Sequence, residues 1–320
     1  MTKVNAYEVA KLAHVSPATV SRAINHREAV NPETLQQVDA AMRQLGYELP
    51  KKTVKPIILV NAPDMANLFS VEVIKGINAA AKANSTTVLI DQTNLTSDNI
   101  RDYLTQLSAL HVEGLITLSR LSENVLKRLS KVTRIVQCAE HNPDAAVPFV
   151  GIDDYQAALQ ATEYLISTGK QRLCLVNTTD RNRYATQRRR GFLDAVKAAG
   201  LELIDNWQIN LSAVNFDIAY ATLEQLFAEG DTPDGFLCIS DTIGAALIRA
   251  AHQYHFKIPE QIGVVGFDNT VISKMTEPPL TTINVPKFQE GYSAFEMLFN
   301  GTDNQGELKL PTELIIRKTT

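Results

Sequence analysis

The residues best suited to chemistry in this 320-residue sequence lie near its start, in the segment Val15–Asn25. It reads Val-Ser-Pro-Ala-Thr-Val-Ser-Arg-Ala-Ile-Asn. Short hydroxyl and amide side chains suit phosphate oxygens, and an arginine can donate two hydrogen bonds to a guanine edge in the major groove. These residue types predict contact with DNA, with Arg22 as the principal base reader.

The same segment carries the signals of a helix start. Ser16 can accept from the unpaired N–H groups of the first turn, and Pro17 suits the first helical position. Val20 and Ile24 lie four residues apart and predict the inward face, which leaves the hydrogen-bonding side chains outside. An ordinary amphipathic surface helix has the same pattern, so the neighbouring elements must decide.

Those neighbours complete a helix-turn-helix. Ala6–Ala13 places apolar residues at helical spacing, and only two residues separate it from the next helix. Asn31 followed by Pro32 predicts a third helix, which Gly46 ends. Three such helices can close a small core.

Charge separates this small head from a large body. The whole chain has a formal charge of −4, but residues 1–55 carry +3 and the remainder −7. A basic head on an acidic body is expected where only the head meets phosphates. The sequence holds no apolar run of eighteen residues and no signal peptide, so we expect a cytoplasmic protein with no membrane contact.

From Pro56 onward, short β-branched runs alternate with longer helical stretches. The predicted strands are 57–60, 87–90, 114–118, 135–137 and 149–152, then 172–176, 207–210, 235–239 and 263–267. The predicted helices are 69–83, 97–110 and 122–130, then 155–168, 185–199, 216–229 and 242–254. Such repetition predicts an α/β body of two doubly wound, parallel-sheet subdomains.

Two such halves favour a ligand site where strand ends and helix starts converge. The loops Asp64–Phe69, Asn177–Arg190 and Ser240–Asp241 are the candidates. Asp241 has an alternative role as a helix cap, and Arg188–Arg190 has one as a solvated helix face. Arg181 and Arg183 add to the positive charge, which leaves a phosphorylated or acidic ligand open.

No enzyme is indicated. The sequence lacks the nucleophile elbow, the zinc-protease helix, the phosphate-binding loop and the dinucleotide fingerprint. Its six histidines are scattered, and its three cysteines lie far apart in apolar runs. We expect no catalytic residue, no metal and no cofactor.

With these features the chain resembles the lac repressor (LacI/GalR) family of bacterial transcription regulators. The similar segments are Val9–Asn25, Val30–Thr34, Leu45–Tyr47, Asn67–Phe69, Gly76–Ile77, Arg188–Phe192, Cys238–Asp241, Val264–Asp268 and Pro279–Thr282. The resemblance implies a homodimer that binds a pseudo-palindromic operator on double-stranded DNA. It also implies a periplasmic-binding-protein-like body in which two subdomains hold a small effector.

The resemblance assigns roles within the head. It implies that Arg22, Pro17 and Ala18 read bases, with Tyr7 nearby. The residues implied to lie near phosphates are Asn5, Ser16, Thr19, Ser21 and Asn25. Because Pro17 and Ala18 cannot make polar base contacts, they are expected to make van der Waals contacts, for instance with a thymine methyl group.

Within the body, the resemblance implies that Arg188 and Asp241 are paired effector anchors. Phe69 and Ser70 match an aromatic pair of the family, of which one aromatic remains. Val214 stands where many members stack an aromatic ring on the effector, a departure that argues against a flat-ring effector. Asp268, which ends a matching segment, is a further effector-binding candidate.

The largest departure from the family lies between head and body, where family members usually have a hinge helix with leucines that wedge into the minor groove. Here residues 48–56 contain two prolines and no apolar helical period. Lys51 and Lys52 are instead expected to follow phosphates on a basic tether. The expected domains are a head at 1–47, a linker at 48–56 and an effector-binding and dimerisation body at 57–320.

Within that body we expect an N-subdomain of about 57–153 plus 283–306 and a C-subdomain of about 154–282 plus 307–320. The predicted function is repression of a catabolic operon under control of a sugar, sugar phosphate or nucleoside. An alternative is a cytoplasmic small-molecule sensor whose operator binding is weakened because the hinge helix is missing. A sugar-modifying enzyme is a second alternative, without a motif to support it.

Overall fold

The computed structural model describes residues 5–25, 27–47, 55–301 and 306–320. The chain divides into two compact units, residues 1–54 and 55–320. Within the described ranges, no helix is long and apolar enough to cross a membrane.

The head is a three-helix unit. Its elements are α1 (Ala6–Leu12), α2 (Pro17–Asn25), the 3-10 helix η1 (Arg27–Ala29) and α3 (Pro32–Leu45). Asn5 and Glu8 form a reciprocal capping box at the start of α1, and Gly46 ends α3 in the left-handed conformation with φ 61°. Ser16 accepts from Thr19 N–H at 3.1 Å, as the sequence predicts. The core comprises Val9, Ala10, Ala13, Val20, Ala23, Val38, Ala41 and Met42.

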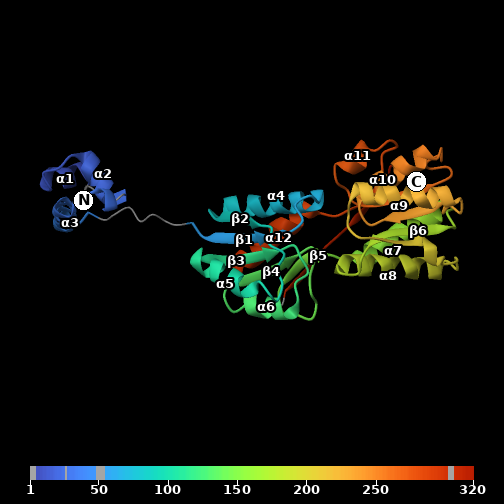
Figure 1. Cartoon of the computed structure of the whole chain (residues 1–320), viewed down its shortest axis with the longest axis horizontal. Helices are drawn as coiled ribbons and strands as arrows, with labels where there is room; N and C mark the ends of the chain where they lie inside the picture. Colours follow the sequence, from blue (N-terminus) through green and yellow to red (C-terminus); the bar gives the residue numbers. More distant parts are fainter. Residues whose placement is uncertain (1–4, 26, 48–54, 302–305) are drawn as a thin grey trace. The chain divides into compact units, whose positions relative to one another are not determined.

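The first subdomain of the body contains a six-stranded sheet in the order β11-β5-β4-β3-β1-β2. Its strands are β1 (Ile57–Asn61), β2 (Thr87–Asp91), β3 (Val112–Thr117), β4 (Arg134–Cys138), β5 (Phe149–Ile152) and β11 (Glu307–Leu310). Its helices are α4 (Leu68–Ala83), α5 (Ile100–Ala109), α6 (Glu123–Leu129) and α12 (Lys287–Asn300). Figure 1 shows α4 and α12 on one face of this sheet and α5 and α6 on the other, each pair sealing its own apolar cluster.

The second subdomain repeats the arrangement in the order β12-β10-β9-β8-β6-β7. Its strands are β6 (Leu173–Thr178), β7 (Gln208–Leu211), β8 (Gly235–Cys238), β9 (Gly263–Asp268), β10 (Thr281–Asn284) and β12 (Glu313–Ile315). Its helices are α7 (Asp154–Ser167), α8 (Arg183–Ala198), η2 (Asp205–Trp207), α9 (Phe216–Glu229), α10 (Asp241–Gln253) and α11 (Ile272–Met275). The predicted α/β class is confirmed, with one antiparallel pair, β10 with β12, at an edge of the second sheet.

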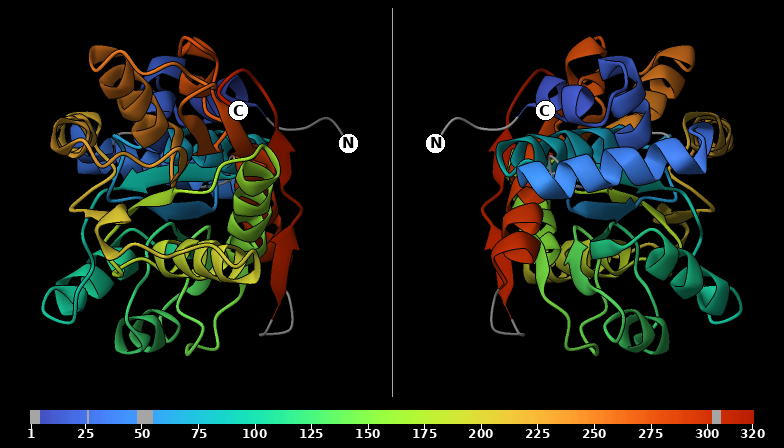
Figure 2. Two further views of the ribbon diagram at one scale, coloured as in Figure 1. Left: turned by 90° about the vertical axis from the view of Figure 1, so that its right-hand side faces the viewer. Right: turned by 90° about the vertical axis from the view of Figure 1, so that its left-hand side faces the viewer.

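The chain passes between the two subdomains after β5, after β10 and after β11. The sequence-based boundary at residue 307 is wrong, because Glu307–Leu310 pairs in parallel with β5 of the first sheet. This short edge strand is mostly exposed, so it lacks the apolar run that marks the buried strands. The two C-terminal strands therefore run along one edge of the body, one in each sheet (Figure 2).

Two glycines allow α4 and α12 to pack at close range. A Cβ atom on Gly76 would lie 1.9 Å from the carbonyl oxygen of Phe288, and one on Gly291 would lie 1.9 Å from that of Val73. No side chain fits in either position, so the helix backbones meet directly. This contact fixes the rotation of α12 and turns the neighbouring Glu290, which is 0% exposed, into the body.

Candidate functional site

The exposed face of α2 carries the predicted DNA-reading residues. Ser16, Pro17, Ala18 and Arg22 are exposed and Thr19 is half-buried, while Val20 and Ala23 face the core. Ser21 is exposed as well. This surface offers an arginine, hydroxyls and small apolar groups together, a composition suited to a major groove. The individual DNA contacts stay predictions.

Two further head residues, Tyr7 and Asn5, are expected near the DNA from the family resemblance. Tyr7 is 73% exposed, and the carboxamide oxygen of Asn5 accepts from the N–H groups of Tyr7 and Glu8. A phosphate contact by Asn5 would therefore use its amide NH2 group. Lys51, Lys52 and the side chain of Asn25 lie outside the described residues.

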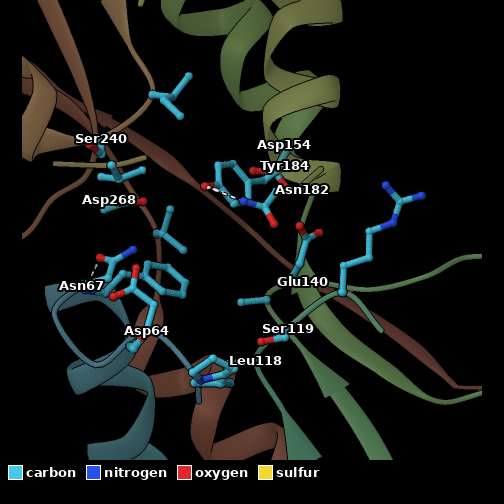
Figure 3. A pocket seen from close by; sticks show the side chains of 18 of the residues that line it. Asp64, Asn67, Leu118, Ser119, Glu140, Asp154, Asn182, Tyr184, Ser240 and Asp268 are labelled. Atoms are coloured by element: carbon cyan, nitrogen blue, oxygen red, sulfur yellow. Dashed lines mark hydrogen bonds between the residues drawn. The ribbon is translucent and has the colours of Figure 1, made fainter. Parts of the chain in front are cut away.

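A cavity of about 610 Å³ lies between the two subdomains of the body. Its volume is in the range of small-molecule sites. Figure 3 shows its walls coming from both subdomains: Asp64, Asn67, Ser119 and Glu140 from the first, and Asp154, Asn182, Tyr184 and Asp268 from the second. Opposed polar groups of this kind can hold a ligand and the two subdomains together.

Sheet topology explains the position of this cavity. In each sheet the strand order reverses beside the first strand of that subdomain, β1 or β6, so the loops that follow neighbouring strands diverge and leave a crevice. All three loops singled out from the sequence contribute lining residues, including Asp64, Asn182 and Ser240.

Arg188 of α8 is the central cation of the cavity. It is 6% exposed, its Nε donates to Asp154 at 2.8 Å, and its Nη1 donates to the carbonyl oxygen of Ile239 at 2.6 Å. Asp268 lies 3.8 Å from Nη1, and the guanidinium stacks 3.5 Å above the Phe267 ring. Burial disfavours the positive charge of the guanidinium and by itself would lower the pKa of Arg188. The attraction of Asp154 and Asp268 is larger than this effect, so the pKa of Arg188 is raised.

The structure corrects the expected pairing of Arg188 with Asp241. Asp241 is 0% exposed and does not line the cavity. Its carboxylate accepts from Thr270 N–H at 2.5 Å, from Thr270 Oγ1 at 2.9 Å and from Thr282 Oγ1 at 2.6 Å. As the first residue of α10 it turns back toward β10 instead of into the cavity, so the acidic partners of Arg188 are Asp154 and Asp268.

The remaining effector candidates all line the cavity. Phe69 is half-buried and Ser70 is 9% exposed, both from the start of α4, and Val214 lies on the opposite wall. The expected basic group does not converge there. Arg181 and Arg188 line the cavity, whereas Arg189 is held outside it by Asp180 and Asn210.

Sequence reasoning missed three acidic residues of this cavity: Glu140, Asp154 and Glu290. Burial raises the pKa of Glu140 to about 7, although it accepts from the N–H groups of Arg183 and His141. Burial, followed by repulsion from Asp154 and Asp268, raises the pKa of Glu290 to about 8. The sequence does contain one signal for Glu290, which is an acidic residue at a position where the helix pattern expects an apolar one. It lies four and eight residues before Ala294 and Leu298 on the apolar stripe of α12.

Comparison with known proteins identifies both units. Residues 6–49 match the family described as "Bacterial regulatory proteins, lacI family". Residues 55–318 match "Periplasmic binding proteins and sugar binding domain of LacI family". The HTH-type transcriptional repressor CytR of Escherichia coli (strain K12) is 28% identical over 326 residues, which cover 98% of this chain and 95% of that protein.

Solved structures agree in fold. A complex described as "transcriptional regulator CelR-cellobiose complex" superposes with a TM-score of 0.73 at 25% identity, covering 99% of this chain and 100% of that one. The lac repressor bound to ONPG in the repressed state superposes with a TM-score of 0.77 at 23% identity, covering the whole of both chains. The chain therefore belongs to the lacI family of bacterial regulatory proteins, and it is a DNA-binding transcription regulator with a small-molecule-binding body.

Proposed function

We propose that this protein is a homodimeric repressor whose affinity for its operator depends on a small polyhydroxylated effector held between the two subdomains. One observation carries the proposal: the 610 Å³ cavity is lined by polar side chains from both subdomains. A ligand that contacts both walls favours one degree of closure, and the heads of the dimer respond to that change. Residues 1–47 would read DNA, and residues 57–320 would bind effector and partner.

Binding to the DNA upstream of its own gene tests the first half of the proposal. Fluorescence anisotropy with that fragment and with a random fragment of equal length measures specificity at moderate salt. Specific binding by members of this class exceeds non-specific binding about a thousandfold or more. Equal affinity for both fragments, with and without ligand, would leave the weakened-operator sensor as the better description.

The walls of the cavity favour a ligand with several hydroxyl groups. The carboxylates of Asp154 and Asp268 accept hydrogen bonds, and Asn67, Asn182 and Tyr184 add amide and phenol groups. The likeness to the cellobiose complex supports a saccharide-sized ligand. Val214 offers no ring for stacking, so a flat-ring ligand would have to stack on Phe69 or Tyr184 instead.

An exposed apolar patch supports the homodimer. Leu68, Val271 and Phe288 are 37%, 59% and 47% exposed around one groove of the body, and Met275 is 75% exposed on the adjoining α11. Clustered apolar side chains of this size mark interfaces. Light scattering after size exclusion tests this: Val271→Asp with Met275→Glu should yield monomers, whereas a dimer of unchanged stability would exclude this patch.

No catalytic group is assigned in this proposal, and the protein acts in the cytoplasm, where its DNA is found. The relatives are transcription regulators, which supports binding without turnover. Incubation with each cavity ligand, followed by chromatography, tests this point. Recovery of any altered ligand would favour the sugar-modifying alternative.

A further inference from the structure

Glu290 is a buried carboxylate without a protein partner among the described residues. It is 0% exposed, it lines the cavity, and neither Oε1 nor Oε2 has a hydrogen-bond partner. Leaving such a group unpaired costs free energy, and an apolar residue would avoid that cost on the apolar stripe of α12. An unpaired buried acid beside a ligand cavity points to a partner that arrives with the ligand.

The protein's own cations near Glu290 are already engaged. Arg188 donates to Asp154 and to the carbonyl oxygen of Ile239, and it faces Asp268. Lys287 Nζ donates to the carbonyl oxygens of Asp268 and Val285. Both cations interact with Glu290 at longer range, but neither forms a hydrogen bond with it among the described contacts.

The buried wall of the cavity therefore has more carboxyl groups than cationic groups. Glu140, Asp154, Asp268 and Glu290 contribute four carboxyl groups. Among the described residues the buried cations beside them are two, the guanidinium of Arg188 and the ammonium of Lys287, which is 7% exposed. Arg120, Arg181 and Asp64 also line the cavity, but these three residues are exposed to solvent. This distribution disfavours an anionic ligand in the interior and favours a cation there.

We propose that the effector carries a protonated amine, as an amino sugar does, and that this amine pairs with Glu290 while Asp154 and Asp268 accept from its hydroxyl groups. This inference rests on the proposed function, because it names the chemical class of the effector in the same cavity. A neutral sugar brings no positive charge that would stabilise the carboxylate form of Glu290, and a sugar phosphate would add negative charge beside Asp154 and Asp268.

A proton balance accompanies this pairing. In the ligand-free protein the raised pKa keeps Glu290 largely protonated at neutral pH. The ammonium group stabilises the carboxylate, so the carboxyl proton leaves to solvent as the amine binds. We expect the wild type to release about one proton per bound amine at pH 7, beyond any change at the amine itself.

Matched ligand pairs test the inference. The panel comprises D-glucosamine, D-galactosamine and 1-amino-1-deoxy-D-sorbitol, each with its hydroxyl counterpart and each hexosamine with its N-acetyl form, plus D-glucose 6-phosphate. Thermal shift followed by calorimetry should find an amine that binds about tenfold or more tightly than its hydroxyl counterpart, since charge-assisted hydrogen bonds exceed neutral ones. A panel in which no amine binds, or in which neutral or phosphorylated members bind best, overturns it.

Variants localise the effect. Glu290→Gln and Glu290→Met should each remove the amine preference and reduce proton release while the hydroxyl counterpart still binds; two variants guard against misfolding of one. Asp102→Asn, an exposed acid on α5, should behave as the wild type. Persistence of the amine preference in both Glu290 variants would overturn the assignment.

The DNA assay separates this inference from the proposed function. Specific operator binding without an amine preference defeats the inference alone. An amine preference that depends on Glu290, in a protein with no specific DNA binding, defeats the repressor proposal and leaves the ligand assignment standing.

Discussion

The backbone N–H of Arg183 donates to Oε2 of Glu140 at 2.7 Å, which ties the first turn of α8 in the second subdomain to the loop after β4 in the first. The acceptor is a carboxylate at a helix N-terminus, where the helix dipole favours negative charge. Arg120 adds a longer contact between the subdomains, 3.5 Å from Nη1 to the carbonyl oxygen of Arg181. Glu140 thus both lines the cavity and connects its two walls.

Glu140→Ala should favour the open arrangement of the subdomains. It removes the acceptor at the Arg183 N–H, whereas Glu140→Gln keeps an oxygen at the same place. Small-angle scattering of the ligand-free protein should show a larger radius of gyration for the alanine variant and little change for the glutamine variant. A radius equal to that of the wild type in both variants would mean that this hydrogen bond does not hold the subdomains together.

Glu290 predicts how the stability of the body depends on pH. Its pKa rises from 4.5 to about 8 on folding, so between these values the folded state holds a proton that the unfolded state has lost. The free energy of unfolding therefore falls as pH increases across this window. Glu290→Gln lacks this titration, so its Tm should exceed that of the wild type by an amount that grows from pH 4.5 to 8.

Trp207 is the only tryptophan of the chain and is 2% exposed in the second subdomain, so its fluorescence follows unfolding of the body. Asp102→Asn serves as the control. A Tm difference between wild type and Glu290→Gln that stays constant over the pH window would contradict the assigned titration.

Much of this fold follows from the sequence, because buried parallel strands are continuous apolar runs and the helices between them have clear starts. β5 and α9 begin and end where the pattern predicts. No strand or helix is predicted after residue 268, although the buried strand β10 and the 14-residue helix α12 lie there. The last two strands, β11 and β12, are short and have no buried apolar run. Edge strands of this kind depend on pairing with a neighbour rather than on their own composition.

The cavity could be predicted only in part. The loops that line the cavity could be identified from the sequence, because the topology of a parallel sheet fixes where strand ends lie. The sequence does not show in which direction a side chain at the start of a helix points. Asp241 and Asp154 are both the first residue of a helix, yet Asp154 meets Arg188 and Asp241 meets two threonines. Glu290 comes from a helix distant in sequence, which only the packing of α12 on α4 brings to the cavity.

Asp241 is expected to contribute to stability rather than to effector recognition. Asp241→Ala leaves Thr282 Oγ1 and the Thr270 N–H, both buried, without their acceptor. Losing such a buried network should cost about 2–4 kcal/mol. Urea unfolding followed by Trp207 fluorescence measures this cost. Unchanged stability together with loss of effector binding would restore Asp241 as an effector anchor.

Arg22→Ala should reduce sequence preference more than overall DNA affinity. An arginine that reads a base contributes about 1–3 kcal/mol of discrimination at its position. Lys51→Ala, at a tether position outside the described residues, should weaken binding to all DNA alike and reduce the salt dependence. Anisotropy titrations on operator and random fragments at several salt concentrations distinguish the two. Parallel losses in both variants would contradict the assigned roles.

Gly291→Ala tests whether the close packing of α4 and α12 positions Glu290. In an ordinary exposed helix this change stabilises by about 1 kcal/mol. Here the new methyl group would lie 1.9 Å from the carbonyl oxygen of Val73, so the helices must separate, and overpacking of this kind costs about 1–3 kcal/mol or more. Unfolding followed by Trp207 fluorescence should therefore show a loss of stability.

Gln160→Ala, at an exposed position in the middle of the helix α7, is the control and should be nearly neutral. Because rotation of α12 would move Glu290 away from the cavity, Gly291→Ala should also weaken amine binding more than binding of the hydroxyl counterpart. A stabilised variant would mean that α12 can shift without cost, in which case the burial of Glu290 would not be set by this helix contact.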